Sequence, residues 1–216
     1  MARIVNIERR KRPPRSVGIV FDDGAEIVMH ESVFSRFNLS IGVDMTPEHM
    51  RALEREQTVY EAKAAADRYL ARRPRSVHEV RKHLMRRGID EAFVERAISD
   101  FLDAGLLDDT AFARAFVRDR LAFRPKSRWM IARELRTKGV PDETVQTVLA
   151  DVFPAETEIA SAMALAKKYL ARAGSGDPAR RNRRLFAYLR RRGYDSASIR
   201  SVFHELGLGE GEEQTE

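Results

Sequence analysis

The chain has 216 residues, enough to bury one or two hydrophobic cores, and it contains no cysteine. The lack of cysteine excludes disulfides, thiol catalysis and cysteine-ligated zinc or iron–sulfur clusters. Lysine and arginine number 39 against 33 acids, a formal net charge of +6, although the C-terminal stretch GEGEEQTE contributes four of the acids. The basic remainder indicates a polyanionic partner, most often a nucleic acid, with ordinary solvated charge as the alternative.

No apolar stretch approaches the roughly 20 residues of a membrane-spanning helix, and the N-terminal MARIVNIERRKRPPR lacks the apolar core of a signal peptide. We therefore expect a soluble, cytoplasmic protein with no membrane partner. The sequence has no heptad seam, which makes a monomer the default expectation. His78 and His83 are five residues apart instead of the four that a zinc-protease helix needs, so we expect no metal site there.

Alternating apolar residues predict a β-hairpin around an Asp22-Asp23-Gly24 turn. The alternating positions are Val17, Ile19, Phe21, Ile27 and Met29. Residues 3–8 are a candidate third strand, and a basic, proline-broken loop at 9–15 follows them. A long helix then begins at Thr46-Pro47-Glu48, which supplies an N-cap, a first-turn proline and a favourable charge, and it extends to about Arg72.

The rest of the chain contains three copies of one pattern. Gly88, Gly139 and Gly193 fix the register of the copies, whose basic segments begin RPRSV, RPKSR and DPARR. The corresponding positions include Val80, Ile131 and Leu185; Leu84, Leu135 and Leu189; and, in the preceding segment, Tyr69, Arg120 and Tyr169. The third copy has about five extra residues at 174–178.

Each copy predicts three helices. The first helices end before a proline or glycine, near Arg72, Phe123 and Arg172. The second helices end at the three glycines, which can adopt the left-handed conformation of a helix C-terminus. Ser76 and Glu79 predict a capping box at the start of the first of them. The third helices begin near an aspartate, which suits a helix N-terminus: Asp90, Asp142 and Asp195.

These signals predict a mainly α fold with three tandem three-helix repeats in an elongated array and a small N-terminal β-hairpin element. The expected divisions are an N-terminal extension at 1–45, repeats at 46–103, 104–153 and 154–206, and an acidic, disordered tail at 207–216. Whether the tail regulates or only solvates stays open. The third helix of the first repeat has an apolar stripe of Phe93, Val94, Ala97, Ile98, Phe101 and Leu102. The predicted core residues are Phe93, Ile98, Phe101, Leu135, Val145 and Leu149.

The charge is divided unequally between the helices of each repeat. The net charge of the middle segment is +3 at 76–88, +4 at 126–139 and +6 at 177–193, whereas the third helices carry −4, −3 and −1. A helix-turn-helix reader would place its last helix against phosphates, so the acidic third helices disfavour base-specific reading of duplex DNA. A positive stripe on the middle helices of stacked repeats fits an extended polyanionic partner better.

The candidate residues of this stripe are Arg75, Arg81, Lys82, Arg86, Lys126, Arg128, Arg133, Arg136, Lys138, Arg180, Arg183, Arg184 and Arg190. Trp129 is added because it stands where the other repeats have polar residues. It either stacks on a base or anchors a protein, or it packs against the preceding helix. We interpret Leu107-Asp108-Asp109 as the N-cap of a helix at 110–123 and not as a functional site.

Two segments carry a resemblance to a known family. GLLDDTAFARAFVRDR at 105–120 and IARELRTKG at 131–139, with LARRPRS at 70–76, Glu79–Leu84 and Gly88, resemble the bacterial regulatory protein RecX family over roughly residues 60–206. The hairpin region resembles the N-terminal extension of some members. The third repeat departs most from the family pattern, through its insertion and its RRNRR sequence.

The resemblance implies a regulator of homologous recombination and DNA repair that binds the RecA–DNA filament and depresses the ATPase, strand-exchange and coprotease activities of RecA. It implies no enzyme activity and no cofactor, and the sequence likewise has no phosphate-binding loop or nucleophile elbow. Expected partners are the RecA filament and single- and double-stranded DNA. The alternatives are a helical DNA-binding regulator without a recombinase partner and a scaffold that binds only proteins.

Overall fold

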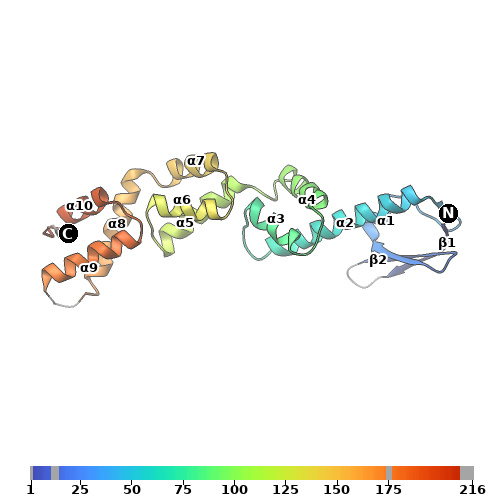
Figure 1. Cartoon of the computed structure of the whole chain (residues 1–216), viewed down its shortest axis with the longest axis horizontal. Coiled ribbons are helices and arrows are strands. Elements are labelled where there is room, and N and C mark those ends of the chain that lie inside the picture. The colour runs from blue at the N-terminus through green and yellow to red at the C-terminus, as the bar shows by residue number, and fades with distance from the viewer. Residues whose placement is uncertain (1, 11–14, 174–176, 210–216) are drawn as a thin grey trace. The chain divides into compact units, whose positions relative to one another are not determined.

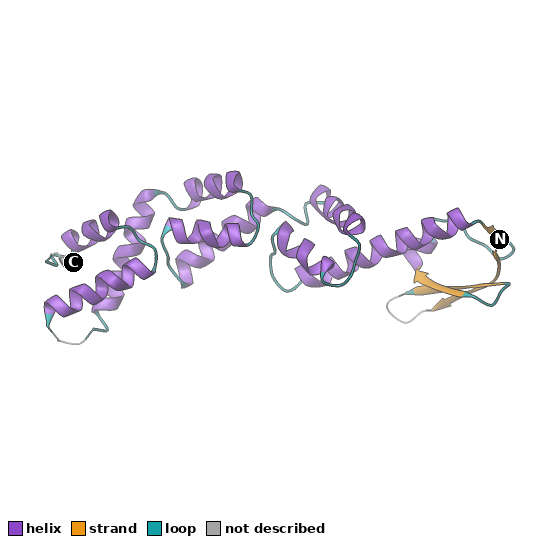
Figure 2. Ribbon diagram, viewed as in Figure 1, coloured by secondary structure: helices purple, strands orange, loops and turns teal. Residues whose placement is uncertain are grey.

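The computed structural model describes residues 2–10, 15–173 and 177–209. It divides into two compact units: unit 1 comprises Met1–Pro74 and Val80–Leu107, and unit 2 comprises Arg75–Glu79 and Asp108–Glu216. Figure 1 labels elements of both units where there is room, and Figure 2 shows that the strands of the described residues belong to unit 1. Within the described ranges, no helix is long and apolar enough to cross a membrane.

Unit 1 begins with an antiparallel sheet in the order β3-β2-β1-β4. Its strands are β1 (Ala2–Arg10), β2 (Ser16–Phe21), β3 (Glu26–His30) and β4 (Asp44–Met45). The predicted hairpin is β2 and β3, which pair Val17 with Met29 and Ile19 with Ile27. The sheet is larger than predicted, because β1 is longer than residues 3–8 and β4 adds a strand. With only two residues, β4 has no alternating pattern that sequence analysis could detect.

Two helices of unit 1 pack against this sheet. They are α1 (Glu31–Phe34) and α2 (Pro47–Leu70). The Thr46 side chain accepts a hydrogen bond of 3.2 Å from the His49 N–H, which confirms it as the N-cap of α2. Leu53 of α2 is buried with Ile4 and Ile19 of the sheet. The same helix continues as the first helix of repeat 1, followed by α3 (Val77–Met85) and α4 (Glu91–Asp103).

Unit 2 contains the other two repeats. Repeat 2 consists of α5 (Asp109–Phe123), α6 (Arg128–Thr137) and α7 (Asp142–Val152), and repeat 3 of α8 (Ala155–Leu170), α9 (Pro178–Arg191) and α10 (Ser196–Glu205). In each repeat the first and third helices contact each other more extensively than either contacts the middle helix. Repeats 2 and 3 each have their own cluster of buried apolar residues, to which the middle helix contributes Ile131 and Leu135 in repeat 2 and Leu185 and Leu189 in repeat 3.

The predicted helix boundaries are largely confirmed by their backbone geometry. Gly88, Gly139 and Gly193 have φ angles of 77°, 75° and 89°, in the left-handed region that favours glycine. The third helices differ in how they begin. Asp195 accepts a hydrogen bond of 2.6 Å from the Ser198 N–H, but Asp90 caps α4 without a side-chain hydrogen bond, and Asp142 lies inside the first turn of α7.

One residue of the predicted core, Phe93, and one of the predicted apolar stripe, Leu102, are not buried. Leu102 is 45% exposed, and Phe93 is half-buried at the edge of α4. The buried face of α4 consists of Val94, Ala97, Ile98 and Phe101. Leu102 follows Phe101 directly, so it lies about 100° around the helix from the face that packs against α2. The basic-loop residues 11–14, the insertion residues 174–176 and the tail residues 210–216 lie outside the described residues.

Candidate nucleic-acid interface

The middle helices meet the following repeat through a junction that occurs twice in unit 2. In the first junction, the Ser76 hydroxyl donates a hydrogen bond of 2.6 Å to the Lys138 carbonyl, beside Gly139. In the second, the Ser127 N–H donates one of 3.0 Å to the Arg192 carbonyl, beside Gly193. Both serines are buried. The start of one middle helix therefore lies on the glycine turn that ends the next.

The neighbouring repeat also supplies an acid to each helix start. The N–H of Val77 donates to the Asp109 carboxylate at 2.9 Å, and the N–H of Arg128 donates to the Glu158 carboxylate at 2.9 Å. A carboxylate is favourable there because the N-terminal N–H groups of a helix carry partial positive charge. Sequence analysis identified the capping box of Ser76 and Glu79, which is confirmed, but missed these long-range partners.

The segment at 107–109 is confirmed as a helix start. Asp108 accepts hydrogen bonds from the N–H groups of Thr110 and Ala111, at 2.7 and 3.0 Å. Asp109 has the additional role at the junction, which the helix-cap interpretation did not include.

In the first two repeats, ion pairs neutralise much of the predicted stripe. Arg81 contacts Glu95 through two hydrogen bonds of 2.6 and 2.9 Å. The other paired cations of the stripe are Lys126 with Glu134, Arg136 with Asp142, and Lys138 with Glu79. The acidic third helices that sequence analysis contrasted with the stripe therefore supply two of its partners, Glu95 and Asp142.

The remaining predicted cations of these repeats lie in different surroundings. Arg75 is half-buried, and Arg128 donates a hydrogen bond of 3.3 Å to the Phe153 carbonyl. Lys82, Arg86 and Arg133 are exposed.

Glu134 is largely enclosed, with 23% of its side chain exposed. Burial alone would raise the pKa of its carboxyl group, but hydrogen bonds from Lys126 and Arg120 outweigh burial and lower the pKa below its usual value. The Arg120 contact is 2.6 Å long. Repeat 2 thus has a single carboxylate between two cations.

Repeat 3 is different, because its predicted cations lack such partners. Arg180, Arg183, Arg184 and Arg190 are exposed on α9, and within the part of the chain that the structure describes none of them forms an ion pair. The physical reason is the composition of α10. It has one acid, Glu205, whereas α4 has four acids and α7 has three. Among the described residues, the predicted cations without an ion pair are therefore most numerous on repeat 3, although Lys82, Arg86 and Arg133 of the other repeats are also exposed.

Repeat 3 also has a pocket of about 650 Å³, which sequence analysis did not foresee. One side is α8 with the residues after it, and another is α9. The third side is the end of α5, with Phe123, and the connection to α6, with Pro125. The basic lining residues are Lys168, Arg172, Arg180, Arg181, Arg184 and Arg192. The aromatic ones are Phe123, Tyr169 and Tyr188, and the acid is Asp177.

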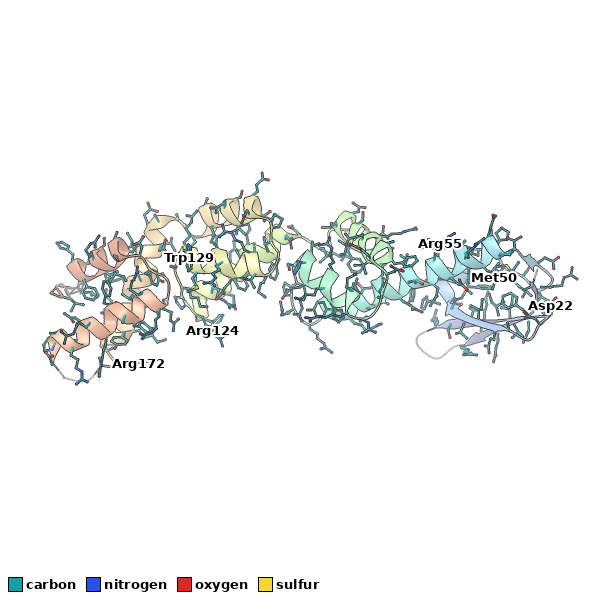
Figure 3. The ribbon with its side chains drawn as sticks, in the orientation of Figure 1. Asp22, Met50, Arg55, Arg124, Trp129 and Arg172 are labelled. Atoms are coloured by element: carbon teal, nitrogen blue, oxygen red, sulfur yellow. The ribbon has the colours of Figure 1, made fainter. Side chains whose placement is uncertain are left out.

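Trp129 of α6 projects from repeat 2 and is 58% exposed (Figure 3). The guanidinium of Arg133 lies 5.6 Å from its ring centre. Trp129 is therefore more exposed than a ring packed fully against the preceding helix would be. An exposed aromatic ring beside a cation is typical of a binding surface.

The two histidines considered as metal ligands are far from equivalent. His78 is exposed at the first junction, and His83 stacks on Tyr69 with ring centres 4.0 Å apart. Among the described residues, no group of three or more potential ligands is close enough to hold a metal ion.

Comparison with known families and proteins places these repeats. Family models for the first, second and third three-helix domains of RecX match residues 62–101, 108–149 and 156–203. The chain is also 30% identical to the regulatory protein RecX of Halalkalibacterium halodurans, over 99% of this chain and 82% of that one. The chain belongs to the RecX family. The RecX of Thermobifida fusca is 38% identical over 67% of this chain and 78% of its own.

Solved RecX structures share the fold. A crystal structure described as regulatory protein RecX matches with a TM-score of 0.77 at 25% identity, and the match covers 94% of this chain and all of that one. RecX from Lactobacillus salivarius matches with a TM-score of 0.63 at 22% identity, over 70% of this chain and 98% of that one. The predicted family and the predicted tandem repeats with a small strand element are thereby confirmed.

Proposed function

We propose that this RecX-family protein regulates homologous recombination and DNA repair by binding the RecA–DNA filament and depressing RecA activity. The observation that carries the proposal is the tandem match of all three repeats to RecX domains, in a chain similar to proteins named regulatory. A filament presents a regular series of phosphates and protein surfaces, which tandem repeats are suited to follow.

The electrostatics of the repeats support the same proposal. Cations without ion-pair partners among the described residues lie on α9, and an exposed tryptophan lies on α6. Such groups supply phosphate contacts and an anchor for a partner. We propose that the protein acts by occupancy, without a catalytic step or a cofactor, and that it acts in the cytoplasm, where RecA filaments form.

The single-stranded-DNA-dependent ATPase of RecA from the same organism tests the proposal. We expect inhibition when the protein is added at a small fraction of the RecA concentration, because one bound regulator would affect many subunits of a filament. Inhibition that appears only when the concentration of this protein equals that of the DNA sites would instead indicate simple competition with RecA for DNA. An unchanged ATPase at all ratios would refute the proposal.

A helical DNA-binding regulator without a recombinase partner is the second candidate, and the concentration of positive charge on α9 favours it. Salt dependence distinguishes the candidates from a scaffold that binds only proteins. Contacts with about five phosphates predict a log–log slope of about −4.5 on duplex DNA and about −3.5 on single strands. A scaffold would bind neither form of DNA.

A further inference from the structure

The pocket of repeat 3 gathers positive charge that the protein itself does not neutralise. Two segments supply it: Lys168 lies in the last turn of α8 and Arg172 just after that helix, and Arg180 and Arg184 lie one turn apart on α9. Among the described side chains, these four cations have no ion-pair partner. Like charges around one concave site repel each other, so this arrangement is stabilised by an anion that enters from outside.

The acid of the pocket is already engaged. The carboxylate of Asp177 accepts hydrogen bonds of 3.1 and 3.2 Å from the N–H groups of Ala179 and Arg180, as the N-cap of α9. It therefore serves the helix start and does not neutralise the arginines on the next turns. The Nε atom of Arg181, another lining residue, is buried and has no hydrogen-bond partner among the described residues.

Aromatic rings form the other part of the pocket. Tyr169 and Tyr188 lie with ring centres 5.1 Å apart, and the Arg192 guanidinium is 5.2 Å from the Tyr188 ring centre. Phe123, at the end of α5, is 80% exposed, which is costly for a phenylalanine unless a partner covers it. Planar apolar rings beside arginines are the combination that binds bases and phosphates of a single strand.

The shape and the rings decide between ligand classes. A duplex is convex and its bases are stacked inside, so it meets a concave pocket only with its backbone and leaves the aromatic rings unused. An acidic peptide would pair with the cations but offers no ring to stack on Tyr188 or Phe123. A single strand has exposed bases and one phosphate per nucleotide, so it can satisfy both halves of the pocket.

We infer that the pocket of repeat 3 binds single-stranded nucleic acid, with phosphates on Lys168, Arg172, Arg180 and Arg184 and a base against Tyr188 and Phe123. This deepens the proposed function by naming the ligand of one site. The test of this inference uses DNA without RecA, so its failure and the failure of the proposed function can be told apart. If the protein inhibits the RecA ATPase but the pocket does not bind single strands, only the inference is wrong. If the pocket binds single strands but the ATPase is not inhibited, only the proposed regulation of RecA is wrong.

The test measures fluorescence anisotropy of labelled oligo(dT) of about 16 nucleotides, near the upper end of known site sizes, with the full chain. The matched variants lie on one helix. Arg180→Gln with Arg184→Gln removes two charges from the pocket, and Arg183→Gln with Arg190→Gln removes two exposed charges outside its lining. We expect at least about a tenfold loss of affinity for the first pair and about two- to threefold for the second, with the salt slope reduced by about 1.4 only in the first. Equal losses would overturn the pocket in favour of diffuse attraction.

A second comparison tests the aromatic half. Tyr188→Phe keeps the ring and is expected to bind as the parent does, whereas Tyr188→Ala should lose about five- to tenfold, with unchanged helix content by circular dichroism as the folding control. An abasic strand of the same length should bind the parent as weakly as oligo(dT) binds Tyr188→Ala. If duplex DNA or a polyglutamate peptide binds the pocket as tightly as oligo(dT) and with the same dependence on Arg180 and Arg184, the assignment to single strands is wrong.

Discussion

Repeats 2 and 3 have the same three helices but place different chemistry at one position between the first and middle helices. In repeat 2, Arg120 and Glu134 form an ion pair of 2.6 Å. In repeat 3, the corresponding residues are Tyr169 and Tyr188, whose rings pack together. Glu134 cancels the charge of its neighbours from inside the repeat, whereas Tyr188 leaves the arginines around it available. The residue at the position of Glu134 and Tyr188 thus distinguishes the two repeats. In repeat 2 the charges stabilise the repeat itself, and in repeat 3 they are available to a ligand.

The junction is what the two repeats have in common. Gly139 and Gly193 each end a middle helix, and each lies against the start of the middle helix before it. At Gly193, an added Cβ atom would lie 2.5 Å from the Ser127 hydroxyl oxygen. At Gly139, it would lie 2.3 Å from the Cβ atom of His78. Glycine is needed there for space as well as for its left-handed backbone.

The largest expected effect is therefore Gly193→Ala. It combines a left-handed alanine, which costs about 1–2 kcal/mol, with overpacking at Ser127, which costs about 1–3 kcal/mol. Urea unfolding followed by circular dichroism should show a loss of about 3 kcal/mol. Gly88→Ala is the control, because Gly88 has a similar φ of 77° but open space around its Cβ position, so it should lose only about 1–2 kcal/mol. Equal losses would mean that the junction does not contribute.

The second effect is the removal of the acid that distinguishes repeat 2. Glu134→Gln leaves the half-buried Lys126 without a counter-charge and leaves Arg120 with only the exposed Asp119, so we expect it to lower the free energy of unfolding by about 2–3 kcal/mol at neutral pH. Glu143→Gln, an exposed change on α7, is the matched control and should alter stability by less than about 0.5 kcal/mol.

The pH dependence gives an independent check on Glu134. Because its pKa is lowered in the folded protein, its stabilisation is present above the unfolded pKa of about 4.3 and is lost as the pH falls through the folded value. The difference in stability between the parent and Glu134→Gln should therefore shrink on acidification. A difference that stays constant down to low pH would show that lost packing, and not lost charge, causes the destabilisation.

Sequence analysis predicted the features that depend on neighbouring residues and missed those that depend on distant ones. The hairpin, the Thr46 cap and the three helix-ending glycines all come from local patterns, and the structure confirms them. The ion pair of Lys138 with Glu79 joins residues of two repeats, so no local sequence spacing predicts it. The predicted stripe of basic residues stays a prediction, and the sequence alone could not reveal which of its charges are neutralised by ion pairs.

The pocket of repeat 3 could be predicted from the sequence only in part. Its faces follow from helical spacing on α8 and α9, and the repeat register already aligns Tyr188 with Glu134 and with His83. The difference between an acid at this position in repeat 2 and a tyrosine in repeat 3 is the sequence signal that distinguishes repeat 3. The position of Phe123 beside α9 could not be inferred, because it depends on how repeat 2 packs against repeat 3.

The third effect concerns the buried cores of the same two repeats. Repeat 2 has Phe112 and Val140 at positions where repeat 3 has Ser161 and Tyr194. The aromatic ring therefore comes from the first helix in repeat 2 and from the residue after the glycine turn in repeat 3. The Tyr194 hydroxyl lies 3.1 Å from the Ser161 hydroxyl. Burial raises the pKa of Tyr194 to about 12, although the Ser161 hydrogen bond opposes this shift.

Stability should therefore depend on pH in the alkaline range. A raised pKa means that the stabilisation is fully present below the unfolded pKa of about 10 and is lost as the pH rises towards 12, by about 2–3 kcal/mol. Tyr194→Phe should lose about 1 kcal/mol at pH 7 through the missing hydrogen bond, and its disadvantage should reverse near pH 12. Parallel stability curves for the two proteins between pH 9 and about 12 would rule out the titration of Tyr194 as the cause.

The smallest expected effect is at Trp129, and it sharpens the division between the repeats most directly. Because this ring is 58% exposed, Trp129→Ala should change the free energy of unfolding by less than about 0.5 kcal/mol. If single strands bind in repeat 3, saturating oligo(dT) should leave tryptophan fluorescence of the parent unchanged, while a RecA filament should alter it. Trp129 is the only tryptophan in the sequence, so the signal reports on repeat 2 alone. Quenching by oligo(dT) itself would mean that the strand extends onto α6, and that the ion pairs of repeat 2 do not keep DNA away from it.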